Sequence, residues 1–144
     1  MKKERNPRTC DSAKVSGAEY KASFRVLGTE LDLGGLSSII KLTPTRTHKA
    51  GEPNILGEKF DRDMWLIESP LGRDVEFAEH IRWINNAIGS HISFLKSDKK
   101  DVDLSLVLNY RVYDTDQGGF TLSTDALRAC AELGVRMEFF LLFI

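Results

Sequence analysis

Short apolar segments with a period of two residues alternate along this chain with segments of helical period, and this alternation limits the fold more than any other feature. Four segments rich in β-forming residues predict strands, namely residues 22–28, 64–69, 102–113 and 135–143. Three others place apolar residues at helical spacing, namely residues 33–42, 73–88 and 123–133. The order β-α-β-α-β-(β)-α-β, with modest helices and short turns, predicts an α+β fold. We expect about three helices packed on one mostly antiparallel sheet of four to five strands.

Capping residues mark the ends of these helices. Asp32 and Ser123 carry side-chain oxygens that favour the N-cap position, and Gly134 favours the C-terminal end of the last helix. Residues 28–42 and 119–133 share the succession of turn, cap and helix, each beside a core strand. We therefore expect a faint internal two-fold repeat.

Length and charge favour one domain and exclude two classes of partner. A chain of 144 residues is long enough to bury a core without metals or disulfides. The 20 Lys and Arg residues against 21 Asp and Glu give no overall field that attracts nucleic acid or an anionic membrane, so neither is expected as a partner. Residues 1–18 are predicted to be a polar, mobile tail, and residues 19–144 a single domain.

The two cysteines are far apart in the chain and form no paired-cysteine motif, which favours a reducing compartment. Cys10 falls in the polar tail. Cys130 takes an apolar position of the last helix, where it is expected to face inward with Leu127 and Ala131. We therefore expect a cytoplasmic protein, and no residue pattern predicts a cofactor.

A polar loop between two buried elements contains residues that the core does not require. After the first helix it continues with Arg46, Thr47, His48 and Lys49. Loops often carry binding residues, because the scaffold positions them without fixing their composition. These side chains supply donors for a phosphate, a carboxylate or an acidic protein surface. We predict that the four residues contact a partner or an anion, and the alternative is a solvated connection.

No catalytic set and no metal site is predicted. Residues 114–125 superficially resemble a calcium loop, but a strand precedes them, Thr121 replaces an aliphatic residue and Asp125 is shorter than the usual glutamate, so a turn followed by an N-cap is expected. The histidines are not at ligand spacing, and His80 is placed on a solvent-facing helix surface. Residues 61–63 could hold a cation or pair internally, but a solvated entry to the strand is preferred.

Several of these features together resemble a bacterial family, the domain of unknown function 4279. The resemblance covers roughly residues 20–143. It rests on Phe24-x-Val26-x-Gly28, Leu31-Asp32, Leu42-Thr43-Pro44-Thr45, Lys49-Ala50-Gly51-Glu52, Trp65, and Leu122-Ser123 with Leu127 and Leu133-Gly134. It implies a small cytoplasmic bacterial domain with no established activity, and some members of the family look like immunity proteins of toxin systems. It implies no catalytic residue.

The two tryptophans and the last strand offer further surfaces. Trp65 is expected in the core, with a clamp at the base of the polar loop as the alternative. Trp83 lies off the apolar stripe of its helix, so it is predicted either to form an exposed contact surface or to lie over a sheet edge or the tail. The last strand is apolar on both faces from Phe139 onward, which makes a homodimer through this strand a hypothesis.

These observations favour a non-enzymatic binding or interaction domain, of the immunity type, whose contact residues are Arg46, Thr47, His48, Lys49 and Trp83. A protein partner is expected for such a domain. The alternative is a sensor or regulatory domain that holds a small anion. An enzyme is less favoured, because general acid–base work needs positioned groups that this sequence does not show.

Overall fold

The computed structural model of the chain describes residues 17–98, 101–113 and 119–144. Five strands form one sheet in the order β2-β3-β1-β4-β5. Their bounds are β1 (Ala18–Gly28), β2 (Arg46–His48), β3 (Asp63–Glu68), β4 (Asp103–Val112) and β5 (Arg136–Phe143). Neighbouring strands are antiparallel except β4 and β5, which are parallel. The predicted α+β fold with a mostly antiparallel sheet is confirmed, whereas most of the predicted N-terminal tail, residues 1–16, lies outside the described residues.

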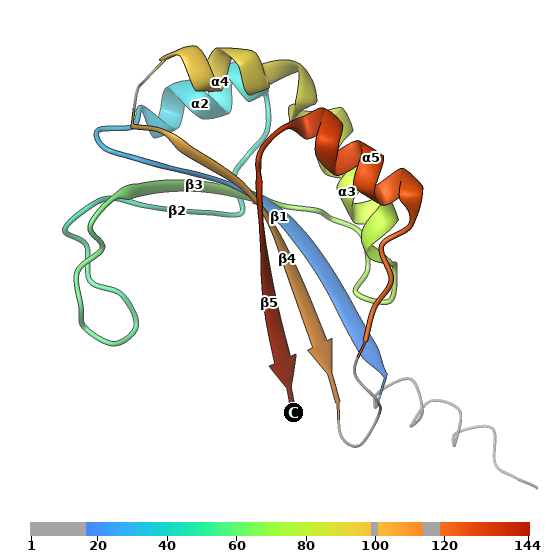
Figure 1. Cartoon of the computed structure of the whole chain (residues 1–144). Coiled ribbons are helices and arrows are strands. Elements are labelled where there is room, and N and C mark those ends of the chain that lie inside the picture. The colour runs from blue at the N-terminus through green and yellow to red at the C-terminus, as the bar shows by residue number, and fades with distance from the viewer. Residues whose placement is uncertain (1–16, 99–100, 114–118) are drawn as a thin grey trace, which may run out of the picture.

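The helices lie on one face of this sheet. They are α2 (Leu33–Ile40), α3 (Phe77–Ile88), α4 (Ile92–Asp98) and α5 (Thr124–Leu133), and a 3₁₀ turn, η1 (Gly89–His91), joins α3 to α4. Figure 1 shows α2 and α4 over one end of the sheet and α3 and α5 packed together over the other. Among the described residues, no helix covers the opposite face of the sheet, which we call the open face. None of these helices is long and apolar enough to cross a membrane.

The hydrophobic core fills the space between the sheet and the helices. Successive strand side chains point to opposite faces, and alternate residues of the three central strands enter this core. Trp65 is fully buried there, and its Nε1–H donates a hydrogen bond to Ser37 Oγ at 3.0 Å, which confirms its predicted core position. Cys130 is also buried as predicted, and burial raises the pKa of its thiol.

The predicted N-caps are confirmed. The Asp32 carboxylate accepts a hydrogen bond from the Gly35 N–H at 3.0 Å, and the Ser123 hydroxyl accepts one from the Ala126 N–H at 3.1 Å. Both helices end at a residue in the left-handed conformation, Lys41 with φ 63° after α2 and Gly134 with φ 68° after α5. The two predicted repeat units therefore share the same kind of cap at both ends of their helices.

Two details of the predicted helices are wrong. Helix α3 begins at Phe77 rather than near Arg73, because the residues before it form a turn in which the Val75 N–H bonds the Gly72 carbonyl at 3.2 Å. In α5, Leu127 is half-exposed, and Ala131 is exposed as well. The buried stripe of α5 has a spacing of four and three residues and consists of Ala126, Cys130 and Leu133.

Part of the predicted polar loop is a strand. Residues 46–48 form β2, which pairs with β3 through Arg46↔Leu66, Thr47↔Trp65 and His48↔Met64. Thr45 extends this pairing, since its N–H donates to the Leu66 carbonyl at 2.8 Å. Strand β2 is therefore one edge of the sheet, and the connection to β3 begins only after His48. The predicted turn at residues 114–118 lies outside the described residues.

Candidate functional site

The strand register determines which side chains share the open face. Phe24 and Val26 of β1 enter the core, so the odd-numbered residues of β1 point the other way. Paired residues of neighbouring strands point to the same face, so each set of paired residues forms a row across the sheet. Three such rows are Arg46–Leu66–Arg25–Ser105–Arg136, Glu68–Ser23–Val107–Glu138 and Lys21–Asn109–Phe140.

A cavity of about 360 Å³ lies on this open face. Its lining comes from four of the strands and from the connection between β3 and α3, namely Glu19, Tyr20, Lys21, Ser23, Arg46, Leu66, Glu68, Arg73, Asn109 and Arg111. Four of these side chains are cations and two are carboxylates. The lining of this cavity is therefore predominantly basic, although the whole chain carries a net charge of −1.

One end of the cavity is organised around Glu19. Its Oε1 lies 3.1 Å from Arg73 Nη1 and 3.8 Å from Arg111 Nη1, and its Oε2 accepts a hydrogen bond from the Tyr113 hydroxyl at 3.0 Å. Burial raises the pKa of Glu19, but the hydrogen bonds from Arg73 and Tyr113 and the two arginine charges outweigh it and lower the pKa below its usual value. Glu19 is thus an ionised carboxylate shared by two arginines.

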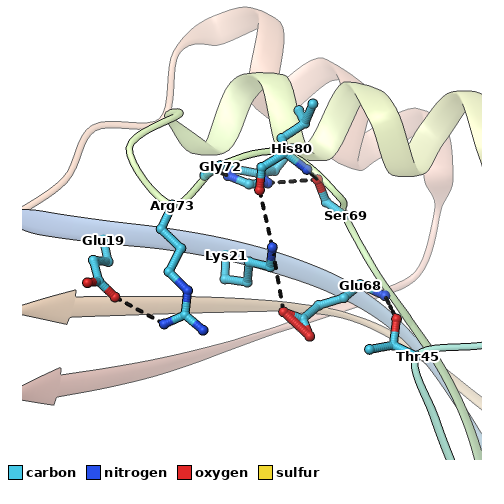
Figure 2. A network of polar contacts seen from close by, with 9 residues as sticks. Glu19, Lys21, Thr45, Glu68, Ser69, Gly72, Arg73 and His80 are labelled. Atoms are coloured by element: carbon cyan, nitrogen blue, oxygen red, sulfur yellow. Dashed lines mark hydrogen bonds and ion pairs between the residues drawn. The ribbon is translucent and has the colours of Figure 1, made fainter.

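A second ion pair crosses the middle of the cavity. Lys21 Nζ donates a hydrogen bond to the Leu71 carbonyl at 3.1 Å and lies 3.7 Å from Glu68 Oε1. The backbone N–H of Glu68 in turn donates to Thr45 Oγ1 at 2.9 Å. Figure 2 shows these contacts beside the Arg73–Glu19 pair, with Arg73 reaching down to the sheet from the turn before α3.

Arg46 differs from the other cations of the cavity. No residue of the described part of the chain forms a hydrogen bond or ion pair with its guanidinium group, and its side chain is exposed. The amide of Asn109 and the hydroxyl of Ser23 are likewise without a partner among the described residues, and both groups line the same cavity. Unengaged donors are therefore concentrated between Arg46 and the middle of the sheet.

A smaller and more apolar cavity adjoins this one. It has a volume of about 230 Å³ and shares Ser23, Arg46, Leu66 and Asn109 with the larger cavity. Its other lining residues are Arg25, Met64, Val107 and Phe140. The Arg25 guanidinium is held by Glu138 and by Ser105 Oγ, so its charge is compensated within the sheet.

The structure separates the four predicted contact residues of the polar segment. Arg46 and His48 point to the open face, and Thr47, which pairs with Trp65, points to the opposite one. The His48 ring stacks on Phe60 with a centroid distance of 3.5 Å, and burial lowers the pKa of its imidazole. Of the four residues, Arg46 lines the two adjoining cavities.

Lys49, the fourth residue, contacts the rest of the chain through its ammonium group, although its side chain is half-exposed. Its Nζ donates to the Leu31 carbonyl at 3.1 Å and lies 3.5 Å from a carboxylate oxygen of Asp63. Asp63 also accepts hydrogen bonds from the backbone N–H groups of Ala50 and Leu31, at 2.7 and 2.9 Å. These contacts, led by the one from Ala50, hold the pKa of the carboxyl below its usual value although burial opposes the shift. Of the alternatives for residues 61–63, internal pairing holds for Asp63, which is buried and contacts Lys49, so the preferred solvated entry is wrong for that residue; Asp61 is exposed.

Trp83 is half-buried and packs against the core from α3. It lines a separate open depression together with Leu42, Thr45 and Pro70, at the side of the sheet where the chain enters β2. Trp83 and Arg46 line different cavities.

His80 is a buried polar residue whose role the sequence did not indicate. The prediction of a solvent-facing position is wrong, because His80 is fully buried on α3. Its Nε2 lies 3.1 Å from the Gly72 carbonyl and must donate to it, so its Nδ1 accepts from the Ser69 hydroxyl at 2.8 Å (Figure 2). Burial lowers the pKa of the imidazole. The signal for burial was present, since position 80 is three residues after the buried Phe77.

The Ser69–His80 pair does not form a nucleophilic site. The side chain of Ser69 is fully buried, and its oxygen also accepts a hydrogen bond from the Leu71 N–H at 3.3 Å. The pair therefore stabilises the turn between β3 and α3, from which Arg73 extends. Among the described residues, no group of three His, Cys, Asp or Glu side chains could hold a metal ion.

Comparison with known proteins identifies a family for the chain. No curated protein and no solved structure matches the sequence. The sequence model of one family, described as a domain of unknown function (DUF4279), matches residues 18–143, which begin with β1 and end with β5. Because this match covers most of the 144 residues, the chain belongs to the DUF4279 family.

Proposed function

We propose that the chain is a non-enzymatic binding domain that binds an anionic ligand on the open face of its sheet. The observation that carries this proposal is the 360 Å³ cavity, which has twice as many cations as carboxylates and includes an arginine, Arg46, that no described residue engages. Pockets of roughly 300–1,000 Å³ with a few convergent polar groups are typical of ligand sites. Charge-assisted hydrogen bonds from arginine are among the strongest polar contacts in proteins.

The remaining chemistry of the described residues supports binding rather than catalysis. The Ser69–His80 pair is sealed in a turn, and burial raises the pKa of the Cys130 thiol, which makes it a poor nucleophile. The carboxylates of the cavity are engaged by cations. None of these groups is free to exchange a proton with a substrate in the cavity.

Two kinds of ligand fit this proposal. The first is an acidic segment of a partner protein, which is the form expected of an immunity-type protein in the bacterial cytoplasm. The second is a small anion, which would make the chain a sensor or regulatory domain, and the limited volume of the cavity favours it. Of the predicted contact residues, Arg46 and His48 share the open face and Arg46 lines the cavity, so Arg46 is the central residue in both forms.

A thermal-shift screen of the full chain tests this function. The screen compares anions, cations, neutral metabolites and acidic peptides, and a ligand at 100 times its dissociation constant should add about 2.7 kcal/mol to the free energy of unfolding. We expect stabilisation by anions and its loss in Arg46→Gln. Arg128→Gln is the matched control, since Arg128 is an exposed arginine of α5 paired with Asp125. The proposal fails if no compound stabilises the chain, or if every hit stabilises Arg46→Gln as well as the wild type.

The edge formed by β5 supports a separate proposal about partners, that two copies of the chain pair through this strand. Strand β5 is the second edge of the sheet, and the side chains from Phe139 to Ile144 are all between 41% and 65% exposed. An edge strand presents unpaired backbone groups that a second strand can satisfy. An antiparallel two-fold pairing centred on Leu141 would place Phe139 opposite Phe143 and Phe140 opposite Leu142, so apolar residues would pair on both faces.

A further inference from the structure

The charges that line the 360 Å³ cavity of the open face indicate the class of ligand. Lys21, Arg46, Arg73 and Arg111 contribute four positive charges, whereas the lining has two carboxylates. Two positive charges of the lining therefore have no counter-charge within it. A ligand that carries two negative charges would neutralise the cavity.

The two uncompensated charges lie at different ends. Lys21 is paired with Glu68, so it contributes no excess. Arg73 and Arg111 share the single carboxylate of Glu19, which leaves one positive charge at that end. The other is Arg46, which is unengaged by any residue that the structure describes.

The sheet register gives the separation between these ends. Arg46 is opposite Leu66, which is opposite Arg25 of β1, whereas Arg111 is opposite Glu19 of the same strand. Positions 19 and 25 are about 20 Å apart in an extended strand, at roughly 3.3 Å per residue. Arginine side chains that extend into one cavity bring their guanidinium groups closer together than this, but the backbone positions that carry them are well separated. One small anion such as phosphate would therefore satisfy one end and leave the other without a counter-charge.

The surface between the ends is nearly neutral. Its lining consists of Tyr20, Leu66, the hydroxyl of Ser23 and the amide of Asn109, apart from the internally paired Lys21 and Glu68. Such a floor suits a short hydrocarbon or peptide chain that has few charges of its own. Each end has an excess of one charge, which matches one carboxylate, whereas a phosphate monoester carries about −1.5 to −2 at neutral pH.

We propose that the ligand of this cavity is a linear dianion with a carboxylate at each end, one bound by Arg46 and the other by the Arg73–Arg111 pair. This inference rests on the proposed function and gives the chemical class of its ligand. The same chemistry is available from a free dicarboxylate or from two acidic side chains of an extended peptide. Asn109 is placed to donate to the ligand between the two carboxylates.

Calorimetric titration of the full chain tests this class, at about 50 mM salt because exposed charges are screened at high ionic strength. The ligands are linear dicarboxylates from succinate to suberate, monocarboxylates of the same carbon number, inorganic phosphate, and peptides with two glutamates or two glutamines. We expect the best dicarboxylate to bind at least about tenfold more tightly than its monocarboxylate, since its second carboxylate adds charge-assisted hydrogen bonds from arginine.

Variants assign each carboxylate to one end. Arg46→Gln and Arg111→Gln should each reduce the affinity for the dicarboxylate to that for the monocarboxylate, and Arg128→Gln should leave both unchanged. Far-UV circular dichroism and the urea midpoint of each variant confirm that it is folded. If the diglutamate peptide binds more tightly than every free dicarboxylate, the natural source is a protein segment, and the reverse order indicates a small molecule.

The inference is overturned if a monocarboxylate or phosphate binds as tightly as the best dicarboxylate. It is also overturned if dicarboxylate binding persists in both Arg46→Gln and Arg111→Gln. In either case the proposed function survives when some other compound binds and Arg46→Gln abolishes its binding. If no compound in the titrations or the thermal-shift screen binds, the proposed function and the inference both fail.

Discussion

Replacing Asp63 by asparagine tests the carboxylate that fixes the start of β3. This side chain is 4% exposed and accepts hydrogen bonds from the backbone N–H groups of Leu31 and Ala50, besides its contact with Lys49. It therefore joins three segments: the turn before α2, the chain after β2, and β3. Asparagine has nearly the same shape but offers one acceptor oxygen, so one of the two backbone donors would face an amide NH₂ group.

The expected loss of stability follows from these contacts. Leaving one buried backbone N–H without an acceptor costs about 1–3 kcal/mol. The remaining hydrogen bond also weakens when its acceptor loses its charge, so we expect Asp63→Asn to lower the free energy of unfolding by about 2–4 kcal/mol. This is a large part of a total of about 5–15 kcal/mol. Urea unfolding at pH 7, followed by circular dichroism, should show a lower midpoint with an unchanged slope.

A neighbouring residue provides the matched control. Asp61 is exposed two positions earlier, and Asp61→Asn should change the free energy of unfolding by no more than about 0.5 kcal/mol. Equal midpoints for the two variants would refute the structural role of Asp63. Acid titration gives a second readout, because the folded pKa of Asp63 is lowered. The carboxylate stabilises the fold above its unfolded pKa of about 3.9, and this contribution is lost as the pH falls through the folded pKa, so the difference between wild type and Asp63→Asn should shrink there.

Three further predictions concern other parts of the molecule. Burial lowers the folded pKa of His80, so the unfolded chain binds protons more readily than the folded chain below about pH 6.5. The urea midpoint of the wild type should therefore fall as the pH is lowered from about 7.5 to about 5.0, and it should fall less in His80→Gln. Equal falls in the two proteins would contradict the burial of a neutral imidazole. Lys41 ends α2 in the left-handed conformation, so Lys41→Gly should raise the free energy of unfolding by about 0.5–1 kcal/mol in urea titration, and a decrease would contradict this. Sedimentation velocity at roughly 1–100 μM protein should show dimers whose fraction rises with concentration. The double variant Phe140→Lys/Leu142→Lys should lower that fraction, because it places charges on the exposed edge strand. A wild-type monomer throughout this range would rule out pairing through β5.

Most of the fold could be predicted because local patterns decide it. Alternation of apolar residues gave the strands, and Asp32, Ser123 and Gly134 supplied caps that act within their own helix turn. Two of the buried polar residues, Asp63 and His80, could not be placed in the same way. Their partners are backbone groups of other turns together with the Lys49 ammonium and the Ser69 hydroxyl, and a sequence pattern does not show which of these groups will meet.

The candidate site could be predicted only in part for a related reason. The sequence singled out the polar segment as a contact surface, but its first three residues alternate between two faces because they form β2, and Lys49 contacts Asp63. Arg73 and Arg111 join Arg46 around one cavity through the pairing of β1 with both β3 and β4. Periodicity assigns a strand residue to a face, but it does not specify which strands are neighbours.

The central position of β1 has a consequence for how the protein folds during synthesis. In this strand, Arg25 contacts Ser105, which is 80 residues later, and Glu138, which is 113 residues later. A topology with such distant contacts is expected to fold more slowly than a helical bundle of similar size. At about 5–20 residues per second, Arg25 of β1 would be made roughly 4–16 s before its partner residue Ser105 in β4. During that interval the apolar side chains of β1 have no partner strand on the β4 side, so this strand is exposed to aggregation before the sheet closes around it.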